Sequence, residues 1–511
     1  MTSRSYCAVY DFGLMPYALG DVLTWNVQTA IRCEELGREQ VDAYLCMDER
    51  QPASVYQRGL VTADNRGLFF NELYGAFGTH PKPGSFFLYL RREVMLERLR
   101  EVSKGDAANS ESLADYERAL ESGEDEAALI EYFTKYIHSH ERINAFAAAH
   151  ARIPLLRPSM GCGPDVTGLV ANRFAGKRIV VIHMRLRRLD AGYGGEYSYS
   201  RDSDFLEWFE FLKDAEKKHP DVQFVVMGRL QEKPLELLRL PNVMSLRVLG
   251  LGLGHELSLM LRSDLFIGTS SGFATMANFS EVPYFITKVT RDSCNAYRIE
   301  YGVERLPFAT ERQLLVYEPE THELLMRLLE RGLEGTPPRG GVPGPVVDSA
   351  IDVRGLEWER SLWLHPGATT SRFFAHDIYS DKETAFLIWP RVKEARAAWR
   401  KGLKDQAWTT LNRIEAGFPR MCEKFPEFLR LRGKVAAERN ELETLRSCEE
   451  HLKSLAALEK ARAGFPAKMR RYLHWGYPLA MQLKRVWKRK HRIPRKLAGL
   501  LMRLAAGRSG P

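Results

Sequence analysis

Two side chains suited to binding a diphosphate stand at the end of a run of β-branched residues. The run 179–184 (IVVIHM) predicts a buried strand, which carries His183, and Arg185 follows two positions later. In parallel α/β sheets, ligands bind beyond the carboxyl ends of strands, and residues two apart on an extended chain point to the same side. The planar fork of Arg185 suits a diphosphate, and it would stabilise the charge of a leaving nucleoside diphosphate without a metal. The alternative is a solvated basic loop with Arg187 and Arg188, in which His183 only caps the strand.

A second candidate is a run of small hydroxyl residues between a predicted strand, 265–268, and a predicted helix, 272–279. The run consists of Thr269, Ser270, Ser271 and Gly272. Backbone N–H groups at a helix N-terminus, neighbouring hydroxyls and the close approach that a glycine permits make a site for anions. The alternative is a helix N-cap by Ser270 or Ser271, which needs no ligand. Capping needs one hydroxyl, so three hydroxyls and a glycine in a row favour the ligand.

The segment 190–201 (DAGYGGEYSYSR) lies between these two motifs. Its three glycines predict mobility and its three tyrosines offer stacking surfaces, so it could close over a nucleotide or a sugar. An ordinary flexible loop explains it equally well. Arg201 at its end is a further candidate for contacting a phosphate or the acceptor, and Gly228 ends the next strand along the chain.

Three other patterns are better explained without a metal or a cofactor. Asp202-Ser203-Asp204 has the spacing of a metal-binding DxD motif, but it opens an amphipathic helix, where aspartates favour the helix dipole. The glycines of 250–254 (GLGLG) lack the spacing and the acidic residue of a dinucleotide fingerprint. The histidines 138, 140 and 150 are scattered along a helical segment. The sequence therefore predicts no metal ion and no cofactor.

The elements that must position these residues alternate between strands and helices. In the second half, strands are predicted at 179–184, 222–227, 243–248, 265–268 and 283–287, with helices at 204–218, 256–262 and 272–279. In the first half, a strand at 6–12, a helix from Asp21 to about Leu36 and a strand at 41–47 form a βαβ unit. Residues 103–150 are predicted to be helical. The fold class is therefore α/β, with two Rossmann-like domains and a C-terminal helical region.

Prolines and glycines mark the expected domain boundaries. They cluster at 154–164 and again at 335–345 (GTPPRGGVPGP). We expect an N-terminal Rossmann-like acceptor domain at 1–165 and a nucleotide-sugar-binding domain at 166–334, and then a linker at 335–390. Helical hairpins at 391–459 resemble tetratricopeptide repeats weakly, and a generic helical hairpin is an equal alternative. A basic tail follows at 460–511.

Composition suits a globular protein of two or three domains. Of 511 residues, 45% are hydrophobic and 27% charged. The seven cysteines are scattered without a CxxC pair, which favours free thiols in a reducing compartment. Residues 1–10 lack the features of a signal peptide, and no apolar run is long enough for a membrane helix. The expected location is the cytoplasm.

Positive charge is concentrated in the tail. From Lys460 onward there are fifteen Lys and Arg and no acidic residue, so the net charge of +9 leaves −6 for residues 1–459. Trp475, Trp487 and several leucines alternate with the basic residues. This pattern favours peripheral contact with the inner face of an anionic membrane. Nucleic-acid binding is the less favoured competitor, and a solubilised terminal helix is the alternative without a partner.

The motifs at 183–185, 199–202, 227–228 and 266–272 occur in the same order as in a bacterial family of surface-polysaccharide glycosyltransferases. That family is distantly similar to the fucosyltransferase superfamily, which includes the α1,6- and protein O-fucosyltransferases. The resemblance covers about residues 178–290. It implies that Arg185 binds the pyrophosphate of a GDP-sugar and that Thr269, Ser270 and Ser271 contact the donor. Fucosyltransferases usually carry a second arginine where Leu186 stands, so the resemblance leaves the donor sugar and base open.

Residues 20–23 (GDVL) also resemble the first βα loop of two-domain glycosyltransferases such as heptosyltransferases. There the loop faces the interdomain cleft, which implies that Asp21 is a general base for the acceptor hydroxyl. The alternative is that Asp21 is only a helix N-cap.

Together these features predict a GT-B-like glycosyltransferase, of hexosyltransferase or fucosyltransferase type, that is inverting and metal-independent. It would move a sugar from a nucleotide-sugar, preferably a GDP-sugar, to a surface-glycan or lipid-linked acceptor. The predicted catalytic residues are Arg185 and Asp21. The predicted nucleotide-sugar-binding residues are His183, Arg185, Arg201, Gly228, Thr269, Ser270, Ser271 and Gly272. A non-catalytic scaffold with degenerate Rossmann domains and a sugar-nucleotide epimerase are the alternatives.

Overall fold

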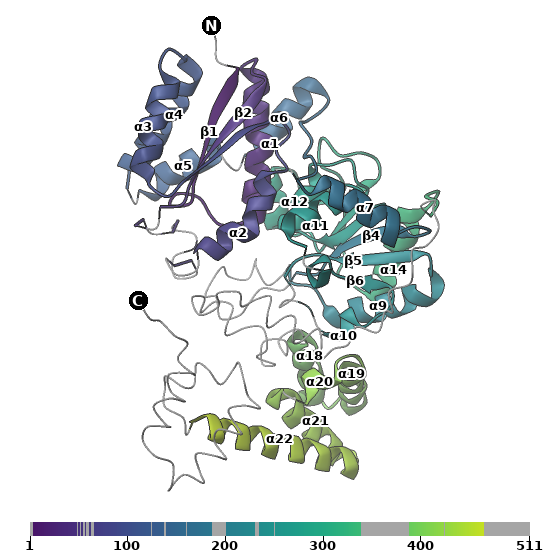
Figure 1. The fold of residues 1–511 in the computed structure, drawn as a ribbon. Helices are drawn as coiled ribbons and strands as arrows, with labels where there is room; N and C mark the ends of the chain where they lie inside the picture. Colours follow the sequence, from purple (N-terminus) through teal and green to yellow (C-terminus); the bar gives the residue numbers. More distant parts are fainter. Residues whose placement is uncertain are drawn as a thin grey trace, which may run out of the picture. The chain divides into compact units, whose positions relative to one another are not determined.

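The computed structural model describes residues 4–185, 201–338 and 388–463, with short gaps at 49, 52, 55–56, 58–60, 63–65, 124, 137–138, 160, 230–232, 234, 250 and 424. Two parallel β-sheets with flanking helices are followed by a helical region (Figure 1). The predicted fold class is confirmed. Most of the tyrosine-rich segment 190–201, most of the linker 335–390 and the basic tail beyond residue 463 lie outside the described residues.

The N-terminal domain has a parallel sheet in the order β1-β2-β3. Its strands are β1 (Ser5–Asp11), β2 (Gln40–Cys46) and β3 (Pro83–Tyr89). The βαβ start predicted from the sequence is confirmed, because α1 (Leu19–Glu35) connects β1 to β2, which pair in parallel. Strand β3 and the preceding helix α2 (Arg66–Phe77) were not predicted. Residues of β3 are mostly half-exposed, so β3 lacks the continuous apolar run of a buried strand.

The predicted helical segment 103–150 is confirmed, although it is broken into several helices. These are α4 (Ala107–Glu121), α5 (Glu126–Tyr136) and α6 (His140–His150), and α3 (Arg92–Ser103), which was not predicted, precedes them. The side chains of Asp106 and Ser139 accept hydrogen bonds at the starts of α4 and α6, where first-turn N–H groups lack helical partners. Helix α7 (Gly163–Arg173) then leads to the second sheet. The expected boundary at 165 lies within α7 and stays a prediction.

The C-terminal domain has six parallel strands in the order β6-β5-β4-β7-β8-β9. The strands are β4 (Arg178–His183), β5 (Val222–Val226), β6 (Val243–Met244), β7 (Leu265–Thr269), β8 (Tyr284–Thr287) and β9 (Gln313–Leu315). The chain proceeds outward from β4 to β6 and then returns to β7 beside β4. The two neighbouring strands β4 and β7 therefore form the switch point at which ligands bind in such sheets.

Two details of this sheet correct the sequence analysis. The strand predicted at 243–248 is wrong beyond Met244, because a 3-10 helix, η4 (Leu246–Leu249), replaces its second half. The three-residue β9 was missed, since so short an edge strand carries no periodic signal. The remaining helices are α9 (Phe205–Lys218), α10 (Leu235–Leu238), α11 (Leu253–Met260), α12 (Gly272–Asn278), α13 (Arg291–Tyr297) and α14 (His322–Leu333).

Helices of the two domains pack directly against each other. Helix α1 contacts α12 and α2 contacts α11 (Figure 1). The second crossing is close because two glycines meet: a Cβ added to Gly75 would lie 2.6 Å from the backbone nitrogen of Gly254. Buried apolar side chains of both sheets belong to one continuous core.

The helical region begins with α18 (Trp389–Arg400), α19 (Lys404–Gly417) and α20 (Pro419–Cys422). Ion pairs join it to α9: Arg391 contacts Asp204 at 2.7 Å and also Glu207, and Arg413 contacts Glu207 at 3.2 Å and also Glu210. Helices α21 (Pro426–Glu438) and α22 (Leu442–Ala463) complete it. Residues from Arg432 onward form a separate unit, in which Gly433 lies against Cys448. The likeness to tetratricopeptide repeats stays a prediction.

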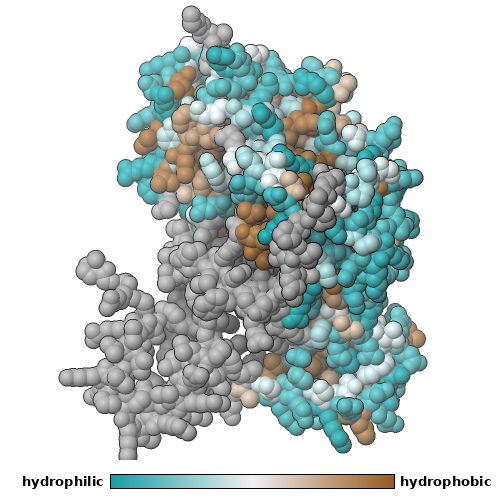
Figure 2. Space-filling view, turned by 45° about the vertical axis from the view of Figure 1, so that its right-hand side comes forward, coloured by the Kyte–Doolittle hydropathy of each residue, from teal (hydrophilic) through white to brown (hydrophobic). Residues whose placement is uncertain are grey.

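None of the described helices is long and apolar enough to cross a membrane. The surface seen in Figure 2 is mostly hydrophilic, with small separate hydrophobic patches among the described residues.

Candidate functional site

A hollow of about 510 Å³ lies between the two domains and is called the cleft below. The N-terminal domain contributes the start of α1, part of α2 and His140, and the C-terminal domain contributes the loops that follow β4, β5 and β7. Eight of the nine predicted site residues line the cleft: Asp21, His183, Arg185, Arg201, Gly228, Ser270, Ser271 and Gly272. The ninth, Thr269, is fully buried at the end of β7 and is not among the lining residues. The structure therefore brings together residues up to 251 positions apart (272 minus 21).

Close packing of β4 against β7 places the two sequence motifs side by side. His183 pairs with Gly268, and a Cβ added to Gly268 would lie 2.8 Å from the His183 carbonyl oxygen. Only glycine fits this contact without a shift of the strands. The loops that follow β4 and β7 consequently leave the sheet next to each other, at its switch point.

The His183 side chain links the two motifs. Its Nδ1 lies 3.0 Å from the Ser271 hydroxyl, and its ring packs against Phe273. Burial, together with the nearby cations Lys233 and Arg185, lowers the pKa of His183 to about 3. The imidazole is therefore neutral near pH 7 and offers no positive charge to a phosphate. Its hydrogen bond to Ser271 orients the hydroxyl loop instead.

Arg185 is held in place by the segment that precedes α9. Its Nη1 donates to Asp202 at 2.6 Å, its backbone N–H donates to the Ser203 hydroxyl, and its carbonyl accepts from the Ser203 N–H. The Arg185 side chain is 16% exposed, so its guanidinium reaches the cleft from a fixed base. Lys288 also fixes this segment, because its Nζ donates to the Asp202 carbonyl.

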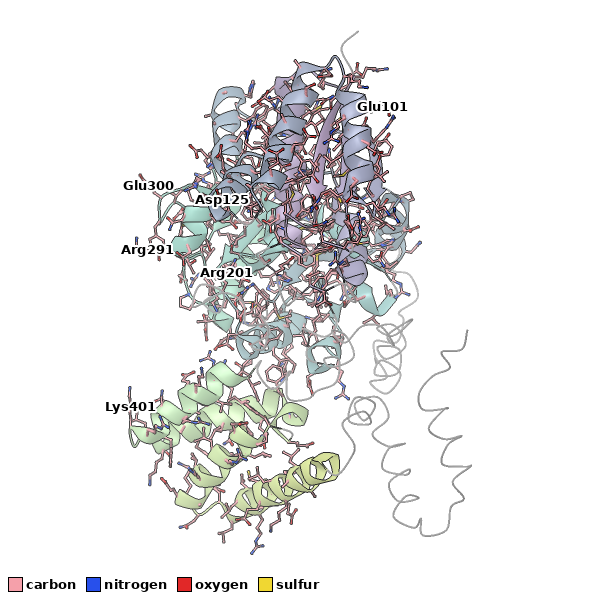
Figure 3. The ribbon with its side chains drawn as sticks, turned by 90° about the vertical axis from the view of Figure 1, so that its left-hand side faces the viewer. Glu101, Asp125, Arg201, Arg291, Glu300 and Lys401 are labelled. Atoms are coloured by element: carbon pink, nitrogen blue, oxygen red, sulfur yellow. The ribbon has the colours of Figure 1, made fainter. Side chains whose placement is uncertain are left out.

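Arg201, labelled in Figure 3, contacts the hydroxyl loop directly. Its Nη1 donates to the Ser270 carbonyl at 3.2 Å, and the Ser270 hydroxyl lies 3.1 Å from the Tyr297 hydroxyl. Arg201 therefore contacts the loop at the start of α12, and Arg185 lines the same cleft. Two guanidinium groups beside a helix N-terminus form an environment that favours an anionic group.

Ser271 is the N-cap of α12 and also lines the cleft. Its hydroxyl accepts a hydrogen bond from the Ala274 N–H at 3.3 Å. The capping alternative raised for this loop is thus confirmed for Ser271, and the same hydroxyl contacts His183. Thr269 instead ends the strand, where it pairs with Thr287.

The start of α1 differs from the sequence prediction. The helix begins at Leu19, two residues before Asp21, and Ala18 is its N-cap without a side-chain hydrogen bond. The interpretation of Asp21 as an N-cap is therefore wrong: Asp21 lies in the first turn and lines the cleft. Gly272 of α12 faces this turn so closely that a Cβ there would lie 3.0 Å from the Gly20 nitrogen. Both helices consequently begin at the cleft.

Sequence reasoning missed an ion cluster that joins the domains at the cleft. Arg247, after β6, contacts Glu256 of α11 at 2.9 Å and Glu72 of α2 at 3.1 Å. Glu256 is fully buried and also accepts a hydrogen bond from the Gly228 N–H at 3.1 Å. Burial raises the pKa of Glu256, against the opposing effect of Arg247 and Lys233. The one signal available in the sequence was a carboxylate within the apolar stretch of α11.

Arg229, like Arg247, belongs to the C-terminal domain and contacts helix α2 of the N-terminal domain. It comes directly after Gly228, which has a φ of +100°, and its guanidinium lies 5.4 Å from the centre of the Phe69 ring in α2. Arg229 and Arg247 both line the cleft, together with Arg185 and Arg201. The C-terminal domain thus presents arginines from the ends of β4, β5 and β6.

The acidic and histidine residues weighed as metal ligands have other contacts. Asp202 pairs with Arg185, and Asp204 caps α9 and pairs with Arg391. His140 lies at the cleft against the rings of Phe279 and Tyr297, and His138 lies outside the described residues. Within the described part of the chain, no group of three or more His, Cys, Asp or Glu is placed to hold a metal ion.

Comparisons with known proteins give distant structural similarities only. No family model matches the chain, and no curated protein matches it. The E. coli ADP-heptose lipopolysaccharide heptosyltransferase II is 12% identical at a TM-score of 0.40, with 66% of this chain and 99% of that chain covered.

Two further solved structures are similar at the same level. A glycosyl transferase family 9 protein from Veillonella parvula is 11% identical at a TM-score of 0.34, with 70% of this chain and 97% of that chain covered. A Listeria monocytogenes protein assigned as a UDP-N-acetylglucosamine 2-epimerase is 12% identical at a TM-score of 0.30, with 71% of this chain and 97% of that chain covered.

Proposed function

We propose that the chain is a GT-B-like glycosyltransferase whose donor, a nucleotide-sugar, binds in the cleft. The supporting observation is that Arg185 and Arg201 line one cleft together with the Ser270–Gly272 loop, at the switch point of the C-terminal sheet. A diphosphate placed there would meet two guanidinium forks and the N–H groups at the start of α12. Thr269 is left out of the proposed contacts, because it is buried away from the cleft.

Arg185 would stabilise the leaving group. Its ion pair with Asp202 fixes its orientation before a donor arrives, so little reorganisation is needed when charge develops on the diphosphate. His183 would support this indirectly, since its neutral ring holds the Ser271 hydroxyl. The sequence resemblance favours a GDP-sugar, and ADP, UDP and CMP donors are the alternatives to test.

Asp21 is the proposed general base. It lies in the first turn of α1 in the N-terminal domain and lines the same cleft as Arg185 and Arg201. The acceptor hydroxyl would attack the anomeric carbon as the bond from that carbon to the diphosphate breaks, and Asp21 would take the hydroxyl proton. Attack from the face opposite the leaving group inverts the anomeric centre. The proposed acceptor is a surface glycan or a lipid-linked glycan, met on the cytoplasmic side of the membrane.

Calorimetric titration with GDP, ADP, UDP and CMP, and with their sugars, tests the donor site. We expect one nucleotide to bind and Arg185→Ala to weaken that binding by at least about tenfold, as expected for a lost charge-assisted pair. Arg178→Ala is the matched control. Arg178 lies at the other end of β4 in a similar ion pair, 2.7 Å from Asp221.

Two outcomes would contradict the proposal. Equal binding by the parent and Arg185→Ala would remove Arg185 from the site. Failure of every nucleotide to bind or to raise the melting temperature would favour a non-catalytic scaffold. Product analysis without an acceptor separates transfer from epimerisation.

A further inference from the structure

An exposed aromatic cluster at helix α13 of the C-terminal domain is called the Tyr301 platform below. It consists of Arg291, Tyr301 and Tyr317. The Arg291 guanidinium lies 4.4 Å from the centre of the Tyr301 ring, and the Tyr317 ring meets Tyr301 edge-on, with 4.9 Å between the ring centres. Arg291 is exposed and lies at the outer surface of the domain (Figure 3). Tyr301 is still 49% exposed beside these two neighbours, which leaves part of the side chain open to a ligand.

A tight turn holds Tyr301 at the surface. Its ends are joined by a hydrogen bond of 3.3 Å from the Val303 N–H to the Glu300 carbonyl, and Gly302 has a φ of +98°. A type II turn needs such a φ at its third position, and Tyr301 stands at the second. Tyr317 fixes the turn further, because its hydroxyl donates to the Val303 carbonyl at 2.7 Å. The backbone that carries Tyr301 is therefore ordered before a ligand arrives, which lowers the entropic cost of binding.

The two kinds of group in the Tyr301 platform match the two kinds of surface on a sugar. The C–H groups on the face of a pyranose ring are apolar, and they pack against the negative face of an aromatic ring. The hydroxyls around the edge of the sugar accept hydrogen bonds, and a guanidinium such as that of Arg291 carries five N–H donors in a fixed fork. An exposed tyrosine beside an exposed arginine is therefore a surface on which a pyranose can both stack and form hydrogen bonds.

Helix α13 connects the Tyr301 platform to the cleft. Ser293, Ala296 and Tyr297 of this helix line the cleft. Arg291 begins the same helix, two positions before Ser293. Tyr301 comes four positions after Tyr297, so their Cα atoms are at most about 14 Å apart. A glycan that has its end in the cleft can therefore reach the platform with a sugar further along its chain.

We propose that the Tyr301 platform binds a sugar unit of the acceptor glycan outside the cleft. Arg291, Tyr301 and Tyr317 are not among the described residues that line the cleft. The acceptor is then a chain of linked sugars, with its end in the cleft and a more distant pyranose on Tyr301. This inference rests on the proposed transferase function, which places the acceptor in the cleft. A second contact on the same chain raises the affinity for long acceptors without touching the reacting sugar.

Calorimetric titration of the full chain with maltotetraose, cellotetraose and tetragalacturonate tests the inference. We expect at least one of these tetrasaccharides to bind more tightly than its monosaccharide. Tyr301→Ala should weaken that binding by about tenfold, because one stacking contact is lost. Tyr301→Phe keeps the ring and should bind at the parental level. Arg291→Gln should also weaken binding, because the guanidinium donors to the sugar hydroxyls are removed.

Tyr74→Ala is the matched control. Tyr74 is a second exposed tyrosine, 54% exposed on α2, and its ring contacts Phe70. Its replacement should leave tetrasaccharide binding at the parental level, and melting followed by circular dichroism confirms the folding of each variant. Equal affinity of the parent and Tyr301→Ala would overturn the inference. So would an equal loss in Tyr74→Ala, or the failure of all three tetrasaccharides to bind the parent.

Nucleotide titration of the same samples separates this inference from the proposed function. Parental binding of both nucleotide and tetrasaccharide by Tyr301→Ala would contradict the sugar site on the Tyr301 platform alone. Failure of the parent to bind any nucleotide, together with tetrasaccharide binding that depends on Tyr301, would support the sugar site and contradict the donor site. Light scattering gives the oligomeric state, and a parental dimer that Tyr301→Ala dissociates would overturn the inference in favour of a contact between two copies.

Discussion

Glu72 and Arg247, which are 175 positions apart in the chain, form an ion pair of 3.1 Å that joins the two domains at the cleft. Arg247 also contacts the fully buried Glu256, whose carboxylate holds the Gly228 N–H. One cluster thus connects helix α2 of the N-terminal domain to the turn after β5. Its two glutamates differ in burial, and this difference makes separate predictions possible.

Replacing Glu256 should destabilise the protein more than replacing Glu72. Glu256→Gln leaves the 11%-exposed Arg247 with one carboxylate partner and should cost about 3 kcal/mol of unfolding free energy. Glu72 is 30% exposed, so Glu72→Gln should lower the free energy of unfolding by less than about 1 kcal/mol. Urea unfolding of both single variants and the double variant measures their coupling. Equal costs would show that burial does not set the strength of this cluster.

The contact of Gly75 with Gly254 should be intolerant of a methyl group. Gly75→Ala places a Cβ 2.6 Å from the Gly254 nitrogen, so α2 and α11 must separate, at an expected cost of about 1–3 kcal/mol. Gly67→Ala in the same helix meets nothing within 4 Å and should be neutral or stabilising. Thermal unfolding of both variants checks this prediction. A Gly75→Ala variant as stable as Gly67→Ala would show that the helices do not need this close approach.

His183 should make stability depend on pH. Its pKa is about 3 in the folded chain and about 6.5 when unfolded, so the unfolded state binds more protons between these values. The free energy of unfolding should therefore fall by about 1.4 kcal/mol per pH unit because of His183, as the pH drops below about 6.5. Glu256 and Glu320 act in the opposite direction, because burial raises the pKa of both carboxyls.

The difference between parent and variant isolates the contribution of His183. Denaturant unfolding of His183→Asn between about pH 6 and pH 4 should show a slope smaller than the parental slope by about 1.4 kcal/mol per pH unit. His150→Asn, at an exposed position, is the control. Identical slopes for parent and His183→Asn would show that this imidazole is not held neutral by burial.

Asp21 should matter for catalysis and not for donor binding. If Asp21 is the general base, Asp21→Asn should lower kcat by about 10²–10⁴-fold, because the acceptor hydroxyl loses its proton acceptor. Nucleotide affinity should stay at the parental level, since Asp21 lies in the N-terminal domain. Turnover and calorimetric titration of the same sample separate the two effects. Full activity of Asp21→Asn would point to another base, with His140 of the cleft as the next candidate.

The sequence alone specified the interior strands and eight of the residues that line the cleft. Runs rich in β-branched and aromatic residues identified β4 and β5, because strands buried on both faces need mostly apolar residues. The position of Arg185 after one strand and of Ser270–Gly272 after another was enough to propose one site, since carboxyl ends of parallel strands share an edge. Strands β3 and β9 gave no such signal, because one is half-exposed and the other has three residues.

Only the tertiary structure decided how the two domains complete the site. Nothing in the local sequence pairs Glu72 with Arg247 or sets Gly272 against Gly20, because these contacts depend on how α2 and α1 pack on the second domain. The tertiary structure also distinguished the role of His183 from that of Arg185, which their spacing in the sequence does not do. His183 is buried and neutral while Arg185 is charged and reaches the cleft, although they are only two positions apart. Burial and neighbouring charge are properties of the folded chain, and they determine which side chain can meet a phosphate.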